Sequence, residues 1–552
     1  MKNKLIKISL LFAVLGTSFS CSKKIDEAYL NPNAATRVPV EELLPQIVSA
    51  MVGNYSTPSA HGTMNDARFV GAYIQQFAYH TTNSNFDRMG YTNNSADVAQ
   101  STFRMHYYDI GQNNMKMIEW ATEDKKWDYV GVGQAIFAWS WLTVADYYAE
   151  LIVKEAFNTS QITFKYDTQE DAYNLARDYA LKALVNLKKT GDGVSQANLA
   201  KGDAFMYNGD VAKWQKFANG ILARYYNHFS NKPSLYKPDS VIHHANLSIL
   251  DNADNAMVKF QATALLATNS FFGPLRNHLS LVSQTEPRSI RQGAYMANLM
   301  NGTNKEFLGA QDPRAWYMLR GNTNGTIVGV PPVVGQQSLA VADRPENFWG
   351  SSQNPSVSNI APTVESGTYL FRNSAPIPVL TASEIQFIKA EAAYRKGGDK
   401  TVALQAYKLG IERSFELLTT TYNANIKPGK EINEANKGAY LTNPVVVPAT
   451  PAGLNLSKIM LQKYIALFAH GALETWLDMR RYHYTDIDPA TGNQVYRDFV
   501  IPTDLFPDNM GLPVQRMRPR FNSEYVWNIL ELGRIGATQN DYHVKEMWIT
   551  KP

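Results

Sequence analysis

Apolar side chains recur at helical spacing along most of this chain, whereas the strict alternation that indicates strands is rare. Residues 166–191 predict one helix, because Asp167 and Glu170 form a capping-box pattern at its start and Gly191 can end it. Further apolar stripes predict helices over residues 40–52, 115–120, 135–148, 211–229 and 456–481. The chain is therefore expected to be mostly α-helical.

A second capping-box pattern, Thr381 with Glu384, predicts a helix that ends in the turn Gly397-Gly398-Asp399. Small residues flank this turn on both sides: Ala390, Ala392, Ala393, Ala403, Ala406 and Gly410. They would let two antiparallel helices pack closely, as in helical-hairpin repeats. The strict 34-residue repeat signature is absent, so any repeats are degenerate.

The segment from residue 230 to residue 375 differs from the rest, because Pro, Gly, Asn and Ser are frequent and helical periods are short. Pro331-Pro332 and residues 350–358 indicate loops. Long loops of this kind are often where a large exported protein binds its ligand.

Composition narrows the class of protein. The chain has 552 residues, of which 12% are aromatic and 18% charged, below the usual charged share of about 25%. Surplus Tyr and Trp can fill a core, or line a surface that receives sugars or another protein. No basic block interleaved with aromatics is present, so nucleic acid is not expected as a partner. The mean hydropathy of −0.30 and the lack of a later apolar run of about 20 residues indicate a soluble body.

The amino terminus has the layout of an export signal. Lys2, Lys4 and Lys7 precede a short apolar run over residues 8–15, and small residues lead to Cys21. Cleavage before Cys21, the only cysteine, and lipidation there would make a bacterial lipoprotein. The alternative is an ordinary secretory signal with an incidental cysteine. An acylated Cys21 would leave no thiol for a disulfide, a nucleophile or a metal site.

Two sets of acidic residues have helical spacing. Glu474, Asp478 and Arg481 stand at i, i+4 and i+7, and Asp146 and Glu150 stand four apart. A glycoside hydrolase needs two carboxylates about 5 to 10 Å apart across a sugar, so a catalytic pair is one interpretation. An ion-pair lattice that fixes helices is favoured, because such spacing arises freely on helices. No catalytic residue is therefore assigned.

His470 and Glu474 have a spacing that two metal ligands could use, but the sequence suggests no third ligand nearby, and a packed helix face is favoured. Residues 486–492 resemble a calcium loop but lack its ligand and glycine positions, which favours a turn. No phosphate loop or nucleophile elbow is present. Neither a metal nor a cofactor is predicted.

Aromatic residues fall into two groups. Trp139, Trp141, Tyr147 and Tyr148 lie in an apolar helical stretch and are predicted to be core. Rings in loops are better ligand candidates, because they can stack on the C–H faces of a sugar while Asn, Asp and Arg reach its hydroxyls. The candidate ligand-binding residues are Asn83, Asn85, Phe86, Asp87, Arg88, Tyr91, Phe271, Phe272, Phe348 and Trp349. The alternative is that these rings anchor loops onto the body or face a partner protein.

A set of motifs runs in consistent order along the chain. They are Cys21, Asn31-Pro32-Asn33, Asp146-Tyr147-Tyr148-Ala149-Glu150, Tyr166-Asp167-Thr168-Gln169-Glu170 with Tyr173, Asp203 to Arg224, Asp312-Pro313-Arg314, Glu391-Ala392, Gln462-Lys463-Tyr464 and Glu474 to Arg481. Together they resemble the SusD/RagB family of outer-membrane nutrient-binding lipoproteins, from residue 21 to about residue 528. The chain departs from the family pattern at Ala149, Glu150 and Ile152.

The resemblance implies a mostly helical fold with about four tetratricopeptide-like helix pairs and an irregular inserted lobe. It implies a signal peptide over residues 1–20, helical parts over 21–230 and 376–552, and the lobe over 231–375, in one composite unit. It also implies a lipid anchor in the outer membrane, with the protein facing outside.

The function that this resemblance implies is binding without chemistry. Proteins that resemble this chain catch glycans, or sometimes peptides, and deliver them to a SusC-like TonB-dependent transporter. Two alternatives stay open at this point. One is an anchored glycan hydrolase of helical fold, and the other is a pure scaffold in which helical repeats hold a partner protein.

Overall fold

The computed structural model describes residues 37–56, 59–90, 101–263, 268–274, 290–349, 366–398, 400–519 and 522–552. The predicted signal peptide, Cys21 and Tyr91 lie outside these residues. The prediction of a mostly α-helical chain is confirmed. Among the helices that the structure describes, none is long and apolar enough to cross a bilayer.

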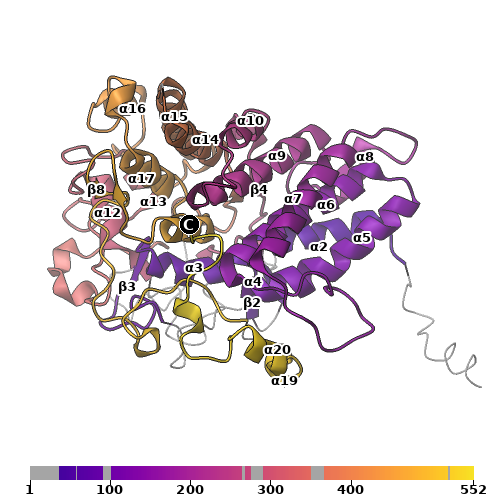
Figure 1. Ribbon diagram of the computed structural model, residues 1–552. Coiled ribbons are helices and arrows are strands. Elements are labelled where there is room, and N and C mark those ends of the chain that lie inside the picture. The colour runs from indigo at the N-terminus through magenta and orange to yellow at the C-terminus, as the bar shows by residue number, and fades with distance from the viewer. Residues whose placement is uncertain are drawn as a thin grey trace, which may run out of the picture.

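Helices dominate both ends of the described chain (Figure 1). The first group comprises α2 (Val40–Val52), α3 (Thr63–Tyr73), α4 (Ser101–Arg104), the π-helix η2 (Met105–Gly111), α5 (Gln112–Glu123), α6 (Trp127–Tyr148), α7 (Gln169–Asn186), α8 (Gln196–Gly202), α9 (Val211–His228) and α10 (Pro238–Asn246). The second comprises α12 (Ala294–Asn301), α13 (Ala315–Met318), α14 (Ala382–Lys396), α15 (Thr401–Thr421), α16 (Glu434–Thr442), α17 (Leu456–Ala466), α18 (Ala472–Arg481), α19 (Asn522–Val526) and α20 (Ile529–Arg534).

Strands are short and pair two by two, always antiparallel. The pairs are β1 (Asn54–Ser56) with β2 (Ser59–His61), β3 (Phe77–Tyr79) with β5 (Ile290–Gln292), β4 (Ala256–Val258) with β6 (Ile377–Leu380), and β7 (Ile487–Asp488) with β8 (Asn493–Gln494). Two of these pairs, β3 with β5 and β4 with β6, tie the loop-rich middle of the chain to the helices on either side of it.

Helix α6 forms the centre of the first helical group. It is apolar all round, and nearly every side chain from Asp128 to Tyr148 is buried, as expected of a helix enclosed by others. Helices α5, α7 and α9 pack around it, and Figure 1 shows the layer continuing through α10 to α14 and α15. The predicted core rings Trp139, Trp141, Tyr147 and Tyr148 are all buried here, which confirms that prediction.

The motif from Asp203 to Arg224 forms a hydrogen-bonded turn that leads into α9. The buried carboxylate of Asp203 accepts hydrogen bonds from the backbone amide of Gly209 (3.1 Å) and the indole Nε1 of Trp214 (2.9 Å). Gly209 has a φ of +81°, and a Cβ there would lie 2.5 Å from the carbonyl oxygen of Gln196. Only glycine fits this turn, so the sequence of the motif follows from its geometry.

The glycine turn after α14 brings α14 and α15 together as predicted. Gly397 and Gly398 have φ values of +79° and +75°, which glycine adopts freely. Gly410 then lets α15 approach the ring of Phe387 on α14, because a Cβ at that position would lie 2.9 Å from the ring. This part of the helical-hairpin prediction is confirmed.

Several predicted helix boundaries are wrong. Helix α5 spans Gln112–Glu123 rather than residues 115–120, α6 begins at Trp127 rather than at residue 135, and α7 ends at Asn186 rather than at Gly191. Helix α7 is capped by Thr168 and Asp171, one residue later than predicted, because loop amides at Val153 and Lys154 already donate to the Asp167 carboxylate. The single helix predicted over residues 456–481 is two helices, α17 and α18. Ala469, with a φ of +66°, turns the chain between them.

Candidate functional site

The predicted residues Asn83 to Arg88 lie in the turn that follows β3. The buried carboxylate of Asp87 organises this turn, because it accepts hydrogen bonds from the backbone amides of Tyr79 (3.1 Å) and Val333 (3.1 Å). Burial raises the pKa of Asp87 to about 7, although both amide bonds act in the opposite direction. The amide of Asn83 donates to the carbonyl oxygen of Val333 (2.7 Å), so the turn is fastened to the loop-rich region.

The other side of the turn is fastened to the carboxyl-terminal part of the chain. Arg88 donates to the side chain of Asp504 (2.8 Å) and its guanidinium lies 6.0 Å from the ring centre of Phe506. Residues far apart in sequence therefore meet at this turn. That is the arrangement expected of a binding loop held by a rigid scaffold.

The predicted loop rings are all buried. The exposed fractions are 7% for Phe86, 5% for Phe271, 0% for Phe272, 1% for Phe348 and 3% for Trp349. Phe86 is stacked between Phe69 and Tyr79, with ring centres 4.9 and 4.6 Å apart. Phe348 stacks on Phe371 at 4.0 Å, and Trp349 donates from Nε1 to the carbonyl oxygen of Phe272 (2.7 Å). The rings anchor loops in this conformation, and their contact with a ligand stays a prediction.

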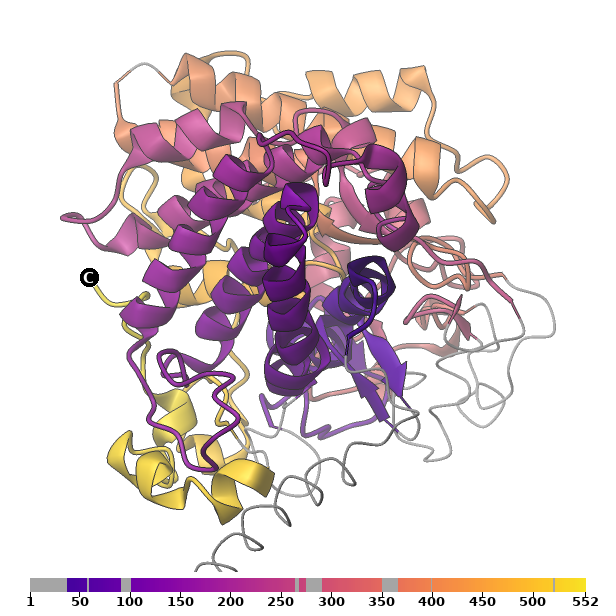
Figure 2. The ribbon, with the colours of Figure 1, turned by 90° about the vertical axis from the view of Figure 1, so that its right-hand side faces the viewer.

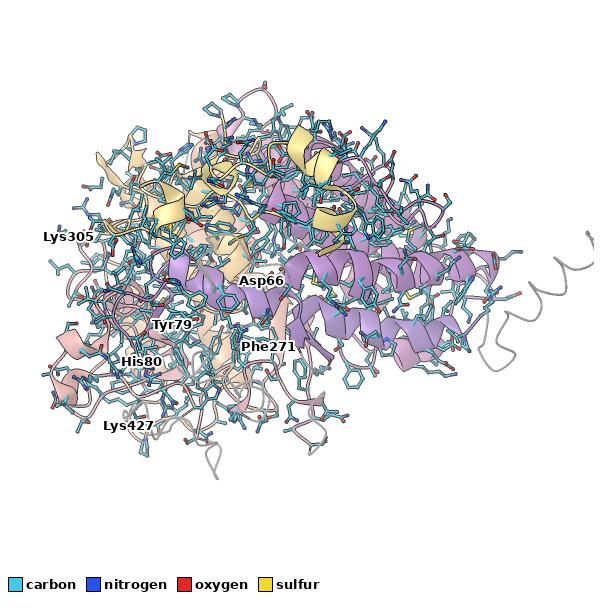
Figure 3. The ribbon with its side chains drawn as sticks, turned by 90° about the horizontal axis from the view of Figure 1, so that it is seen from below. Asp66, Tyr79, His80, Phe271, Lys305 and Lys427 are labelled. Carbon is cyan, nitrogen blue, oxygen red and sulfur yellow. The ribbon has the colours of Figure 1, made fainter. Side chains whose placement is uncertain are left out.

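The outward groups of the turn are polar. Asn83 is exposed, and Asn85 and Arg88 are half-buried. We call His80, Asn83, Asn85 and Arg88 the 80–88 surface, and Figure 3 shows Tyr79 and His80 where this turn leaves β3. It offers amides and a guanidinium that could bind hydroxyl groups.

His80 was not predicted as a site residue. Burial, with Arg291 nearby, lowers its pKa to about 4, so the ring is neutral at physiological pH. Its buried Nδ1 has no hydrogen-bond partner among the described residues. Because Nδ1 is buried, a ligand hydroxyl could form a hydrogen bond with this neutral imidazole only at its other ring nitrogen. The sequence signal that could have indicated it is its position directly after a buried strand.

A cluster of charged side chains lies inside the helical body, apart from the 80–88 surface. Helix α18 directs Glu474, Asp478 and Arg481 into it from one face. The guanidinium of Arg481 pairs with Asp478 (2.6 Å) and with both carboxylate oxygens of Glu391 on α14 (2.8 and 3.0 Å). The favoured interpretation of this spacing, an ion-pair lattice that fixes helices, is confirmed.

Two further cations complete this network. Arg224 of α9 lies 2.6 Å from Glu384 and 3.3 Å from Glu474. Lys463 of α17 lies 3.3 Å from Glu474 and 2.7 Å from Asp478. The network therefore joins α9, α14, α17 and α18. We call these residues, with His228 and Asp146, the buried ion network.

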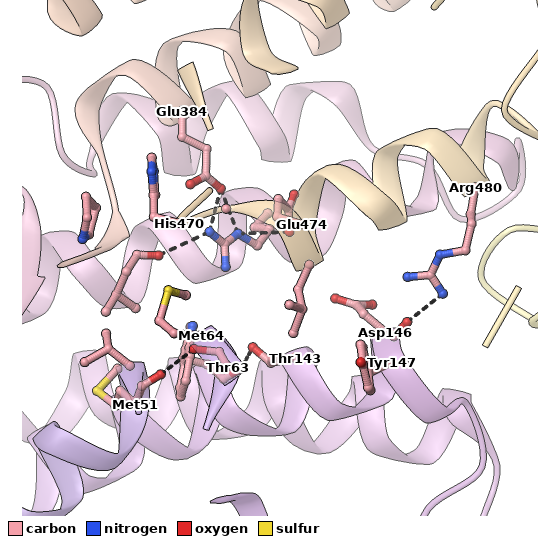
Figure 4. Close-up of a pocket in the computed structure, with 17 residues that line it drawn as sticks. Met51, Thr63, Met64, Thr143, Asp146, Tyr147, Glu384, His470, Glu474 and Arg480 are labelled. Atoms are coloured by element: carbon pink, nitrogen blue, oxygen red, sulfur yellow. Dashed lines mark hydrogen bonds and ion pairs between the residues drawn. The ribbon is translucent and has the colours of Figure 1, made fainter. Parts of the chain in front are cut away.

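The cavity beside this network has room for water but not for a sugar. It measures about 50 Å³, with Glu384 and Glu474 on one side and Thr63 and Thr143 on the other (Figure 4). Ligand pockets are usually several times larger, at about 300 to 1,000 Å³. The other acidic set is split: Asp146 faces His228 (3.5 Å), whereas Glu150 pairs with Arg516 (2.6 Å). Every carboxylate of the two sets is thus engaged in an ion pair.

Asp146, His228 and Glu474 lie close enough to hold a metal ion. Burial alone would lower the pKa of His228, but the carboxylates of Asp146 and Glu474 outweigh it and raise the pKa to about 9. The ring is then an imidazolium that pairs with Asp146 at 3.5 Å and with Glu474 at 3.2 Å. An ion-paired histidine explains this trio.

The charge on His228 predicts a pH dependence of stability. Its pKa is above the unfolded value, so its contribution is complete below about pH 6.5 and is lost as the pH rises through about 9. The free energy of unfolding is expected to fall by roughly 3 kcal/mol over this range. Urea titrations of the parent and of His228→Gln should differ most at pH 6 and least above pH 9.

A matched control is available for that measurement. His483 provides it. A hydrogen bond to Asp486 raises the pKa of His483 to about 9 as well, but the His483 side chain is 38% exposed. Solvent screens such a pair, so His483→Gln should change the pH dependence much less. An equal effect of the two variants would contradict the assignment to His228.

These features define a class of protein: a helical-hairpin body with a loop-rich region, braced by internal ion pairs and presenting a polar turn. The chain belongs to the SusD-like family described as "starch-binding associating with outer membrane", whose sequence model matches residues 32–506. The predicted resemblance is thereby confirmed. Among curated proteins, none matches this chain.

Solved structures agree on the fold. A SusD/RagB family protein from Bacteroides thetaiotaomicron is 19% identical with a TM-score of 0.66, and the alignment covers 93% of this chain and 99% of that one. A SusD homologue from Bacteroides uniformis is 20% identical with a TM-score of 0.65, covering 93% and 99%. A chitin-binding SusD homologue from Flavobacterium johnsoniae is 18% identical with a TM-score of 0.60, covering 93% and 98%.

Proposed function

We propose that this protein is a lipid-anchored receptor on the outer face of the outer membrane, which binds a glycan and passes it to a SusC-like TonB-dependent transporter. The family match over residues 32–506 is the observation that carries the proposal, because the family is described as starch-binding and outer-membrane-associated. The chitin-binding homologue from Flavobacterium johnsoniae gives a second example of a glycan ligand on this fold.

The 80–88 surface is the proposed contact with the glycan. Its exposed amide, half-buried guanidinium and neutral imidazole offer both donors and acceptors to hydroxyl groups. We propose that the predicted rings support these groups from below. A receptor of this kind must also release its ligand, which favours dissociation constants of about micromolar to millimolar.

The test combines affinity with product analysis. Purified protein is titrated calorimetrically with maltoheptaose and with chitohexaose, and each mixture is then examined by chromatography for shorter products. We expect saturable binding of at least one oligosaccharide and no cleavage. His80→Ala should weaken that binding about tenfold, since one hydrogen bond is lost. His243→Ala, an exposed histidine on α10, is the matched control and should change nothing.

The same experiment separates the alternatives. New oligosaccharide products would favour the anchored hydrolase. Binding of peptides instead of glycans would leave the receptor role in place and change the cargo. No binding of either, together with co-purification of a transporter, would favour the pure scaffold.

A further inference from the structure

A second cavity lies away from the 80–88 surface, between the start of the first helical group and the carboxyl-terminal helices. It measures about 540 Å³, which is within the usual range of ligand pockets. Its walls come from α4 and η2, from the loop after α6, and from the start of α19. Figures 1 and 2 both show α19 and α20 (yellow) beside that loop. None of its lining residues belongs to the 80–88 surface.

One wall of this cavity is a seven-residue π-helix, η2 (Met105–Gly111). Such helices are rare and occur frequently at functional sites. Here Tyr107 and Tyr108 of η2 both line the cavity. The hydroxyl of Tyr107 is held by the carbonyl oxygen of Ile152 (2.8 Å), whereas the side chain of Tyr108 is 66% exposed. Tyr108 therefore presents a large ring at the mouth.

The loop after α6 contributes a second ring to the cavity, from a residue in an unfavourable backbone conformation. Phe157 has a φ of +64°, which is a rare conformation for a bulky residue. Its ring rests on Gly111 of η2, where a Cβ would lie only 2.1 Å from the ring. Strain of this kind persists where the surrounding structure over-determines it, and it is concentrated at ligand sites. The glycine and the strained phenylalanine together hold this ring against η2.

Charged and polar groups complete the lining. The buried carboxylate of Glu524 is fixed by hydrogen bonds from the hydroxyl of Tyr166 (2.8 Å) and the amide of Asn528 (2.9 Å). The guanidinium of Arg104 lies 4.7 Å from the ring centre of Tyr108. Gln112 and Thr159 are exposed at the rim. The cavity thus combines aromatic faces with a carboxylate, a guanidinium and neutral polar groups.

We propose that this cavity is a second glycan-binding site, which takes a one- or two-ring segment of a neutral oligosaccharide. A sugar ring has apolar C–H faces, which the rings of Tyr108 and Phe157 can cover, and hydroxyl groups, which Glu524 and Arg104 can bind. An acyl chain offers no hydrogen-bond partner to the charged and polar groups of the lining, which favours a ligand with hydroxyl groups. This inference rests on the proposed glycan-binding function and adds a site to it.

The test locates binding and measures it. Protein that lacks only the predicted signal peptide is treated with hydroxyl radicals in the presence and absence of chitohexaose or maltoheptaose. The modified residues are then identified by mass spectrometry. Tyr108 should be protected several-fold by the oligosaccharide. Tyr108→Ala should abolish the affinity that remains in His80→Ala, and Tyr108→Phe should retain it, because the ring face makes the contact. Leu530→Ala, an 86% exposed apolar residue on the neighbouring α20, is the matched control and should be silent.

The outcomes are distinguishable. If His80→Ala weakens binding while Tyr108 is unprotected and Tyr108→Ala is silent, the second site is overturned and the proposed function stands. If the unaltered protein binds no oligosaccharide, the proposed function fails, and this inference fails with it. Protection of Tyr108 in the unaltered protein, together with affinity that Tyr108→Phe keeps and Tyr108→Ala loses, would support the second site.

Discussion

Replacing Arg481 with methionine is expected to lower the free energy of unfolding by about 3–5 kcal/mol, one of the largest effects of any single change in this protein. The guanidinium holds Glu391 through two contacts of 2.8 and 3.0 Å and Asp478 through one of 2.6 Å. All three side chains are essentially inaccessible to solvent. Methionine fills most of the space but leaves two buried carboxylates with less compensating charge.

The pH dependence of this loss of unfolding free energy should show whether Glu391 causes it. Burial alone would raise the pKa of Glu391, but Arg481 reverses this and holds the pKa well below its ordinary value. The contribution of Glu391 is therefore present above about pH 4.5 and is lost as the pH falls. The difference between Arg481→Met and the parent should be largest near neutral pH and should shrink only as the pH falls below about 4.5.

Urea unfolding followed by circular dichroism provides the measurement, and the chain offers a matched control. Arg534 pairs with Glu531 at 2.8 Å, but its side chain is 53% exposed. Arg534→Met should cost no more than about 1 kcal/mol. The double variant Arg481→Met with Glu391→Gln should recover part of the loss, since it removes one uncompensated charge. A cost for Arg481→Met as small as that of the control would contradict the role given to the buried ion network.

Local signals predicted the helices that carry unbroken apolar stripes. Helix α2 has the bounds that the pattern of residues 40–52 indicates, and α9 ends one residue before the predicted position. The break between α17 and α18 could not be predicted, because it depends on a distant contact. The backbone amide of Ala469 donates to the side chain of Gln76 (3.0 Å), which lies in a different part of the chain.

The same distinction applies to the candidate sites. The spacing of Glu474, Asp478 and Arg481 was enough to favour an ion lattice, because all three lie on one helix. Their partners Arg224, His228 and Glu391 come from other helices, and no local pattern connects them.

The burial of the loop rings was equally unpredictable. It follows from contacts between loops, such as Phe348 on Phe371 and Trp349 on Phe272, whereas the sequence showed only that the rings lay outside regular helices. The π-helix had no sequence signal at all.

Replacing Cys21 with alanine is expected to move nearly all of the protein out of the membrane fraction. The proposed anchor is acylation of Cys21, and no described helix is long and apolar enough to cross a bilayer. One acyl chain gives marginal, reversible binding, whereas two or three chains hold a protein almost permanently, at about 0.8 kcal/mol per buried methylene. Loss of Cys21 removes the acceptor for every chain at once, so the change should be close to all-or-none.

The experiment must separate the lipid from protein contacts, because a receptor bound to its transporter would also sediment with membranes. The chain is therefore expressed without the transporter, membranes are washed with high salt, and the intact mass of the protein is measured. The parent should carry the added mass of its acyl chains, and Ser22→Ala, a neighbouring change that keeps the cysteine, should behave as the parent does. Cys21→Ala protein that stays on washed membranes would show that something other than Cys21 acylation holds it, and an unmodified parent mass would point to the ordinary secretory signal.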